Sequence, residues 1–140
     1  MPLVLVDNNI VEPKVPCVMT DNTAGAREAV EHLIRLGHKD IGFTSGPMTH
    51  SSLYERYQGY RQAMEAYGLP VRPEMVITYE DVADYDVSGG YKAAERLLKR
   101  SPRPTAIFAG NDAMAIGVMK ATQELGLSVP DDLSVVGFDD

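Results

Sequence analysis

The sequence of 140 residues contains one cysteine, no tryptophan and three histidines. A single cysteine cannot form a disulfide framework within the chain, and we expect Cys17, in an apolar stretch, to be a buried structural thiol. Three scattered histidines and one cysteine match no metal-binding pattern. The sequence therefore predicts neither a metal site nor a cofactor, and the cytoplasm is the simplest compartment for it.

Long apolar runs and basic side chains are also scarce. No run approaches the roughly 18 apolar residues that a membrane helix needs, and the chain starts without a basic signal-peptide region, so we expect no membrane partner. Lys and Arg number 13 against 20 Asp and Glu, which gives a net charge of −7. Because nucleic-acid phosphates attract basic surfaces, the chain by itself should bind nucleic acid poorly.

Motifs of catalysis and phosphate binding are missing. The sequence has no Gly-x-Ser-x-Gly, no P-loop and no Gly-x-Gly-x-x-Gly, and no nucleophile with a plausible base. We therefore predict no catalytic residues and a protein that is not an enzyme.

What the sequence does contain is an alternation of short apolar runs with helical periodicity. The runs are residues 3–6, 17–19, 41–44, 75–78, 105–109 and 133–138, rich in β-branched and aromatic residues as in strands buried on both faces. Four helices are expected between them, opening near Asp21, Leu53, Ser88 and Asn111. The first, second and fourth stop at Gly37, Gly68 and Gly126.

This alternation predicts an α/β fold with a doubly wound parallel sheet. The stretch from Ile41 to Phe138 holds four strands and three helices, enough for one lobe. The first 37 residues hold two strands and one helix, too few for a self-sufficient sheet. We therefore expect the chain to be part of a longer protein. The strands at 3–6 and 17–19 should expose edges through which the chain self-associates.

Polar residues follow several of the predicted strands. They are Asp7-Asn8-Asn9, Asp21-Asn22, Ser45, Asn111-Asp112 and Asp139-Asp140. Ligands of open parallel sheets bind outside the carboxyl ends of the strands, so these residues are candidates for a binding site. Carboxylates and amides without a phosphate loop suit a ligand with many hydroxyl groups.

Several segments, in this order and spacing, resemble the LacI/GalR family of transcription repressors. They are residues 20–26, 31–33 and 36–41, Ser45-Gly46-Pro47, residues 55–60 (Glu-Arg-Tyr-Gln-Gly-Tyr), 103–108 and 111–117, and the ending Val129–Asp140. The ending is the most specific of them. Together they cover nearly the whole chain.

The resemblance implies a two-lobed, periplasmic-binding-protein-like fold with a small-molecule effector, most simply a sugar, in the cleft between the lobes. Residues 1–37 would be the tail of the amino-terminal lobe and residues 38–140 most of the carboxy-terminal lobe. The family pattern also implies a homodimer, or another self-association, and DNA contact only through an amino-terminal helix-turn-helix that these 140 residues do not contain.

The resemblance also implies effector contacts. Arg56 matches a family arginine that binds effector hydroxyls or carboxylates, although it could be a solvated helix arginine paired with Glu55 or Glu65. Asp139 matches an aspartate that binds sugar hydroxyls, with a turn carboxylate as the alternative. Asn111 could contact effector, cap the fourth helix, or do both.

Three further candidates are less specific. Tyr85 falls where family members often carry an aromatic that stacks on the effector, but it could be a half-buried loop residue. Ser52 lies four residues before Arg56, where small hydroxyl residues line the cleft. Asp21, with Asn22, could reach the ligand from the amino-lobe side, although capping of the first helix suits both residues better.

Two other classes of protein share this kind of fold. A secreted sugar-binding protein that feeds a transporter is the first alternative, and the ending Val129–Asp140 favours the repressor over it. An enzyme on a flavodoxin-like lobe is the second, and the missing nucleophile and phosphate loop argue against it.

Overall fold

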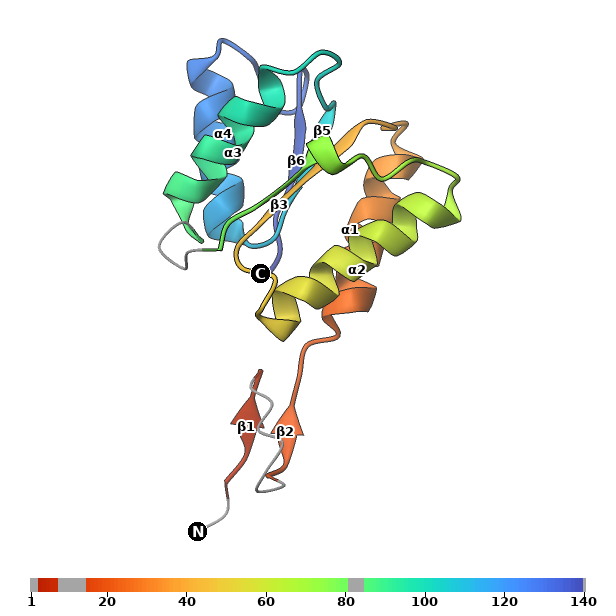
Figure 1. The fold of residues 1–140 in the computed structure, drawn as a ribbon, viewed down its shortest axis with the longest axis vertical. Helices are drawn as coiled ribbons and strands as arrows, with labels where there is room; N and C mark the ends of the chain where they lie inside the picture. Colours follow the sequence, from red (N-terminus) through yellow and green to blue (C-terminus); the bar gives the residue numbers. More distant parts are fainter. Residues whose placement is uncertain (1–2, 8–14, 81–84, 140) are drawn as a thin grey trace.

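Parallel strands flanked by helices form the body of the chain in a computed structural model, which describes residues 3–7, 15–80 and 85–139. The sheet has the strand order β4-β3-β5-β6, all parallel, with β3 at Ile41–Ser45, β4 at Val76–Thr78, β5 at Ala106–Ala109 and β6 at Ser134–Val136. The helices are α1 (Asn22–Arg35), α2 (Ser51–Ala66), α3 (Val87–Leu98) and α4 (Asp112–Glu124), and a short 3-10 helix spans Pro73–Met75. The predicted α/β doubly wound fold is confirmed (Figure 1).

Alternation along the central strands divides the core into two layers. Phe43 and Phe108 face α1 and α2 and pack with Val30 and Tyr60. Ile107, which precedes Phe108 in β5 and pairs in register with Gly42, faces the other side and packs with apolar residues of α3 and α4. Both faces of β3 and β5 are therefore buried, which is why these strands read as continuous apolar runs.

Helices α1, α3 and α4 begin at residues whose side chains cap them, whereas His50 before α2 makes no side-chain capping hydrogen bond. The Asp21 carboxylate accepts a hydrogen bond from the Ala24 amide at the start of α1, and Asp86 accepts from the Ser88 and Gly89 amides at the start of α3. Gly37, Gly68 and Gly126 adopt positive φ just after the ends of α1, α2 and α4. The capping role expected of Asp21 is confirmed.

Helix α1 belongs structurally to the sheet that follows it. Its residues Ala26, Val30 and Leu33 lie in the same buried cluster as Ile41 and Phe43. The chain thus reaches the body at the start of α1, before residue 37. The division of the chain at residue 37 stays a prediction.

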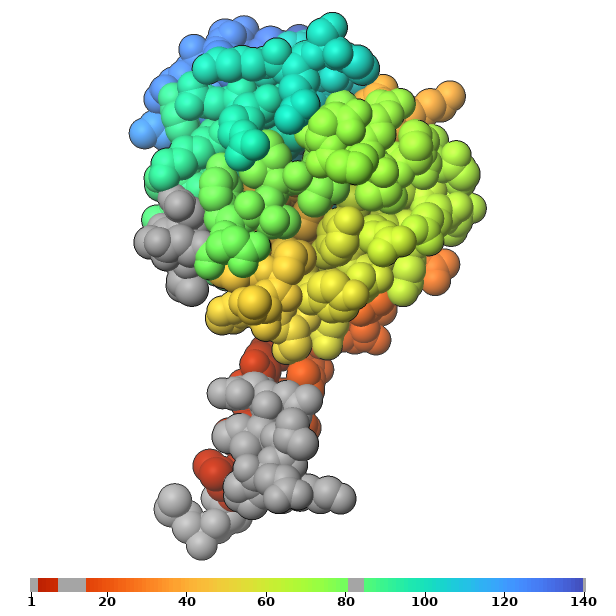
Figure 2. Space-filling view, in the orientation of Figure 1, coloured from red at the N-terminus to blue at the C-terminus, as the bar shows by residue number. Residues whose placement is uncertain are grey.

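Strands β1 (Leu5–Val6) and β2 (Cys17–Val18) pair in parallel as a separate two-stranded ribbon that extends from one end of the body (Figures 1 and 2). The prediction of a buried Cys17 is wrong, because this thiol is exposed. Each strand of the ribbon pairs with one partner strand among the described residues, and apolar positions such as Val6 and Val18 are left exposed. Asn8 and Asn9 of the predicted strand-end cluster lie outside the described residues.

His38 ties the amino ends of three strands together. Its Nδ1 lies 2.9 Å from Thr105 Oγ1 and its Nε2 lies 3.0 Å from Ser134 Oγ. His38 therefore has a structural role, because it links the segment before β3 to the residue before β5 and to the first residue of β6.

A close crossing of α1 and α2 at Gly59 places the start of α1 over α2. A Cβ atom added at Gly59 would lie 2.4 Å from the Thr23 carbonyl oxygen and 2.8 Å from the Ala26 Cβ. Backbone cannot withdraw by such distances without shifting the helix, so only glycine allows this approach.

We predict that Gly59→Ala destabilises the protein by about 1–3 kcal/mol in urea unfolding, because overpacking outweighs the gain of about 1 kcal/mol in helix propensity. The control is Gln62→Ala, an exposed position on the same helix, which should change stability by less than about 0.5 kcal/mol. A stabilised Gly59→Ala variant would contradict the proposed crossing.

Candidate functional site

The carboxyl ends of β3 and β5 meet where the direction of the connections reverses. The chain leaves β3 towards β4 across one face of the sheet and leaves β5 towards β6 across the other. Ligands of doubly wound sheets bind at such a point. The polar residues that follow β5 and β6, and the first turns of α2 and α4, lie at this edge.

Arg56 of α2 is the centre of the polar contacts at this edge. Its Nε donates to Asn22 Oδ1 at 2.9 Å, its Nη1 donates to the Gly110 carbonyl oxygen at 2.6 Å, and its Nη2 pairs with Asp139 Oδ1 at 2.9 Å. The side chain is only 10% exposed. The alternative of a solvated arginine paired with Glu55 or Glu65 is wrong, because Glu55 bonds to Asn22 and Glu65 pairs with Arg61.

Phe138 supports the guanidinium group from one face. The Arg56 Cζ lies 3.9 Å from the centroid of the Phe138 ring, within the range of a cation–π contact. The same ring closes against α1, where a Cβ added at Gly25 would lie 3.1 Å from it. We call Asn22, Arg56, Gly110, Phe138 and Asp139 together the Arg56 site.

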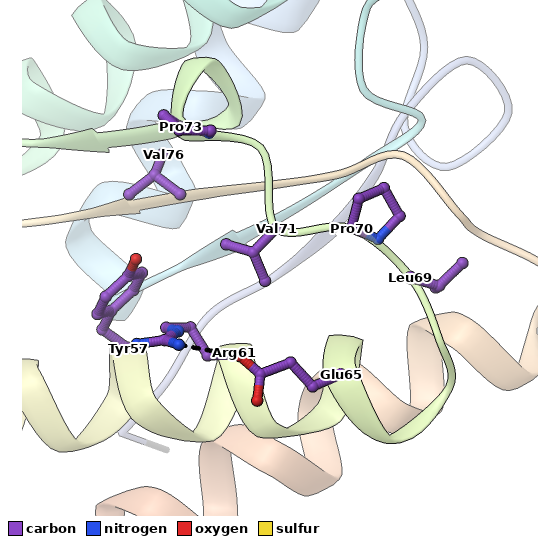
Figure 3. A pocket seen from close by; sticks show the side chains of 8 residues that line it. All are labelled: Tyr57, Arg61, Glu65, Leu69, Pro70, Val71, Pro73 and Val76. Carbon is purple, nitrogen blue, oxygen red and sulfur yellow. Dashed lines mark hydrogen bonds and ion pairs between the residues drawn. The ribbon is translucent and has the colours of Figure 1, made fainter.

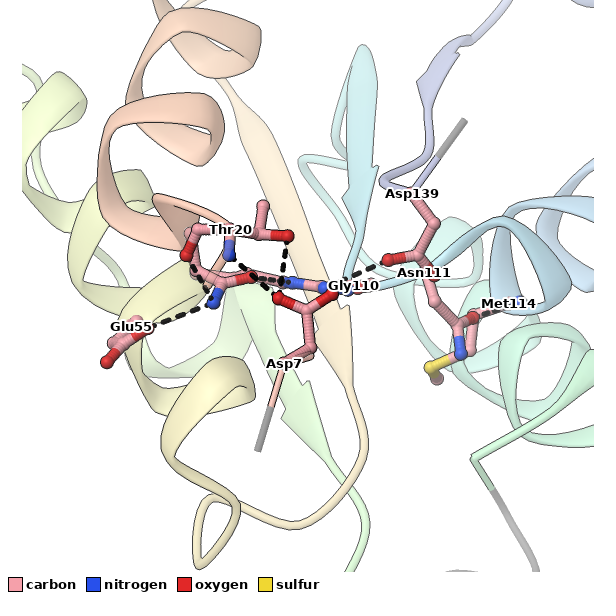
Figure 4. Close-up of polar contacts among 9 residues, drawn as sticks. Asp7, Thr20, Glu55, Gly110, Asn111, Met114 and Asp139 are labelled. Carbon is pink, nitrogen blue, oxygen red and sulfur yellow. Dashed lines mark hydrogen bonds and ion pairs between the residues drawn. The ribbon is translucent and has the colours of Figure 1, made fainter. Parts of the chain in front are cut away.

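Asn22 connects the Arg56 site to the segment before α1. Its Nδ2 donates to Glu55 Oε2 at 3.0 Å and to the Thr20 carbonyl oxygen at 3.2 Å. Thr20 in turn donates its amide and its hydroxyl to Asp7 Oδ1, at 2.7 and 2.9 Å. Figure 4 shows this continuous set of contacts from Asp7 through Thr20 to Asp139.

The two aspartates of this set have unusual backbone conformations. Asp7 has φ 49° and Asp139 has φ 131°, both in the region that favours glycine. Non-glycine residues persist there only when their surroundings hold them, and such residues cluster at functional sites. Their side chains are both held, Asp7 by Thr20 and Asp139 by Arg56.

Asn111 and Tyr85 come close to Arg56 from the opposite face of the sheet. Asn111 is buried and caps α4, because its Oδ1 accepts from the Met114 amide at 2.7 Å. Tyr85 is half-buried across Gly46, where an added Cβ would lie 2.5 Å from the ring. Burial raises the pKa of Tyr85, while the Arg56 charge and a hydrogen bond to Asn111 act to lower it. The sequence-predicted residues Arg56, Asp139, Asn111 and Tyr85 therefore lie together.

The remaining two predicted site residues lie at the margin. Ser52 is partly exposed in the first turn of α2, one turn before Arg56. Asp21 is exposed and uses one carboxylate oxygen to cap α1. For all six residues, contact with an effector stays a prediction. Asp140 lies outside the described residues.

Sequence reasoning missed the role of Asn22. The expectation that Asn22 caps α1 is wrong, since Asp21 is the cap and Asn22 is 3% exposed with its amide turned to Arg56 and Glu55. A signal was present in the sequence, because a helix needs one cap and Asp21 already supplies it.

A hollow of about 590 Å³ on another part of the surface contains none of the predicted site residues (Figure 3). It lies between α2 and the segment leading to β4, and proline and aliphatic side chains form most of its wall. Its charged residues, Arg61 and Glu65, are already paired with each other at 2.9 Å. The hollow is therefore mostly apolar and lies apart from the polar contacts around Arg56.

The part of the chain that the structure describes offers neither a metal site nor a membrane-spanning helix. No group of three or more His, Cys, Asp or Glu side chains there could hold a metal ion. None of the described helices is both long and apolar enough to span a membrane.

Comparison with known families identifies the class of protein. Residues 30–140 match the model of the periplasmic binding protein-like domain, and the chain belongs to this family. A solved structure of a regulatory protein of the LacI family from Chloroflexus aggregans is 38% identical, with a TM-score of 0.88 over 99% of this chain and 49% of that one. The resemblance to LacI-type regulators is thereby confirmed.

Two further relatives define the likeness more closely. A protein named as a probable HTH-type transcriptional repressor, ExuR, from Bacillus subtilis is 39% identical over 140 residues, which are 100% of this chain and 41% of that protein. A LacI-family regulator from Enterococcus faecium, solved with bound ribose, is 28% identical with a TM-score of 0.84 over 99% of this chain and 50% of that one. The chain thus spans between two fifths and half the length of these relatives.

We predict that the Asp7–Thr20 contact is lost at acid pH, when the Asp7 carboxylate is protonated. The Thr20 amide and hydroxyl hold the pKa of Asp7 below 3.8, and the Arg56 charge acts in the same direction. The contact is therefore fully present above that pH and is lost as the pH falls through the lowered pKa. Carboxyl ¹³C NMR titration should show the pKa of Asp7 rising in Thr20→Val, which removes the hydroxyl donor, and an unchanged pKa would contradict the contact.

Proposed function

We propose that the chain is the effector-sensing core of a transcription repressor, with a sugar or sugar derivative bound beside Arg56 and Asp139. The observation that carries this is the state of Arg56. Among the residues that the structure describes, Asn22, Gly110 and Asp139 use three of the five N–H groups of its guanidinium, and the other two are assigned to a ligand. Asp139 is 55% exposed and keeps a second carboxylate oxygen for a ligand hydroxyl.

The pairing with Asp139 favours a neutral polyhydroxyl ligand. Arg56 already has a carboxylate at 2.9 Å, so an anionic ligand would compete with Asp139 for the same charge. Vicinal hydroxyl groups can instead accept from arginine and donate to aspartate at once, which leaves the ion pair intact. Tyr85 and Asn111, close to Arg56, supply an aromatic face and an amide for the same ligand.

Response to the effector requires a second part of the protein. A ligand shifts an arrangement of lobes only if it binds the two arrangements unequally. We propose that residues 1–20 lead from an amino-terminal lobe and that the carboxy-terminal lobe begins with Asp21, because α1 packs into the core of the sheet. DNA contact would lie in a helix-turn-helix outside these 140 residues, in keeping with their net charge of −7.

This proposal is preferred to a transporter-linked sugar-binding protein and to an enzyme. The relatives are transcription regulators by name, including one solved with ribose. A cytoplasmic location follows from that role. The upstream sequence discriminates directly, since a repressor would begin with a helix-turn-helix and a secreted binding protein with a signal peptide.

We expect the intact natural protein to bind a member of a panel of neutral sugars, acidic sugars and nucleobases in calorimetry. Arg56→Met and Asp139→Asn should each weaken binding by about 10–100-fold, because hydrogen bonds to charged groups are lost. Arg61→Met is the matched control, since this arginine lies on the same helix, pairs with Glu65 and makes no hydrogen bond or ion pair with Asn22 or Asp139 among the described residues. Equal losses in all three variants, or none in the first two, would contradict the site.

Self-association is proposed through the β1–β2 ribbon. Leu3, Val4, Val6, Val18 and Met19 are exposed on it, and such apolar positions favour burial against another chain. In sedimentation velocity, the 140-residue chain should associate and Val6→Lys with Val18→Lys should be monomeric. Leu36→Lys, which changes an equally exposed residue on the body, should associate like the unchanged chain. A monomeric unchanged chain at high concentration would exclude the proposal.

A further inference from the structure

The side-chain amide of Asn22 has both of its ends engaged. Its oxygen accepts from Arg56 Nε, and its nitrogen donates to Glu55 Oε2 and to the Thr20 carbonyl oxygen. None of these three contacts caps the helix, since Asp21 caps α1. An amide nitrogen has two N–H groups, so the donors of Asn22 are fully used.

The Glu55 carboxylate, together with the Thr20 carbonyl oxygen, fixes which way this amide points. If the Asn22 amide were flipped, its nitrogen would face the Arg56 Nε–H donor and its oxygen would face the Glu55 carboxylate, and both contacts would be repulsive. Glu55 therefore acts on its neighbour Arg56 indirectly, by orienting the oxygen that Arg56 needs. The close approach of α1 to α2 at Gly59 brings the two helices near enough for this contact.

Removal of the Asn22 oxygen would change how Arg56 is held. The contacts to Gly110 and Asp139 both lie on the Nη atoms, at the far end of the guanidinium group. The Nε contact to Asn22 is the third point that fixes the plane of the group over the Phe138 ring. With two points instead of three, the plane can pivot, and the two N–H groups left for a ligand turn with it.

Asn22 also links Arg56 to the ribbon at the start of the chain. Thr20, whose carbonyl accepts from Asn22, donates its amide and its hydroxyl to Asp7 directly after β1. Hydrogen bonds and one ion pair therefore connect five residues in series. They are Asp7, Thr20, Asn22, Arg56 and Asp139.

We propose that Asn22 is a positioning residue for effector binding: oriented by Glu55, it sets the plane of the Arg56 guanidinium and couples it to the Asp7–Thr20 contact. A movement of the β1–β2 ribbon against the body then changes the affinity for effector through Arg56. The inference rests on the proposed function in that the ligand is taken to bind Arg56. It assigns Asn22 and Glu55 no contact with the ligand.

The first test needs no ligand and uses the intact natural protein. NMR exchange of the Arg56 Nε–H, assigned by its loss in Arg56→Lys, reports on the Asn22 contact. Asn22→Leu should speed this exchange at least about tenfold, whereas the Nε–H of Arg61 on the same helix should keep its rate. An unchanged Arg56 rate in Asn22→Leu would overturn the proposal.

A conservative exchange of donor and acceptor provides the rescue. In the double variant Asn22→Asp with Glu55→Gln, an oxygen still faces Arg56 Nε and the second carboxylate oxygen accepts from the new amide. The donor to the Thr20 carbonyl oxygen is lost in this variant, so protection should return only in part, to a level clearly above that of Asn22→Leu. Glu55→Leu removes one of the two acceptors that hold the Asn22 nitrogen away from Arg56, so it should speed exchange, and it serves as the second test if Asn22→Leu fails to fold. Loss of protection in the double variant, or full protection in Glu55→Leu, would contradict the orienting role.

The second test separates positioning from a merely structural role. Calorimetry with the sugar that binds best should show Asn22→Leu weakening affinity about tenfold in the original protein and not at all in Arg56→Lys, which has no Nε to orient. An equal loss in both backgrounds would mean that Asn22 does not act through Arg56. If the original protein binds no sugar, the proposed function fails, while the exchange measurement still decides the role of Asn22.

Discussion

A buried guanidinium group determines how the elements of this fold meet. Arg56 is 10% exposed, and an arginine cannot lose its charge to escape the cost of burial. The fold must therefore place hydrogen-bond acceptors around the buried group. Three elements supply them: Asn22 at the start of α1, Gly110 after β5 and Asp139 after β6. The layer formed by α1 and α2 and the two neighbouring strands β5 and β6 are joined at one side chain.

Backbone strain collects around the same group. Asp139 holds a φ of 131° beside Arg56, and Asp7 holds a φ of 49° at the other end of the hydrogen-bonded series. The glycines at Gly25 and Gly59 allow Phe138 and α1 to approach as closely as they do. Strained backbone conformations persist only while the surrounding contacts hold them, so displacement of one contact can release the strain. Such a site can respond to a ligand as well as bind it.

Local patterns in the sequence were sufficient for the fold and insufficient for this site. The apolar runs predicted all four strands of the main sheet to within a few residues, because β3 and β5 are buried on both faces and contain little else. The helices followed from their caps and terminal glycines. Cys17 was predicted wrongly because an apolar run does not say how many partners its strand has, and β2 has one, β1.

The geometry around Arg56 could be predicted only as a set of candidates. Motif resemblance named Arg56 and Asp139 separately, but their ion pair joins residues 83 positions apart in the chain, and nothing local encodes it. Asn22 was overlooked because its type and place fit a simpler role, that of a cap. When the neighbouring residue already caps the helix, a polar residue at the helix start is better interpreted as the partner of a distant polar group. Here that interpretation leads from Asn22 to Arg56, and so from the start of α1 to the proposed ligand.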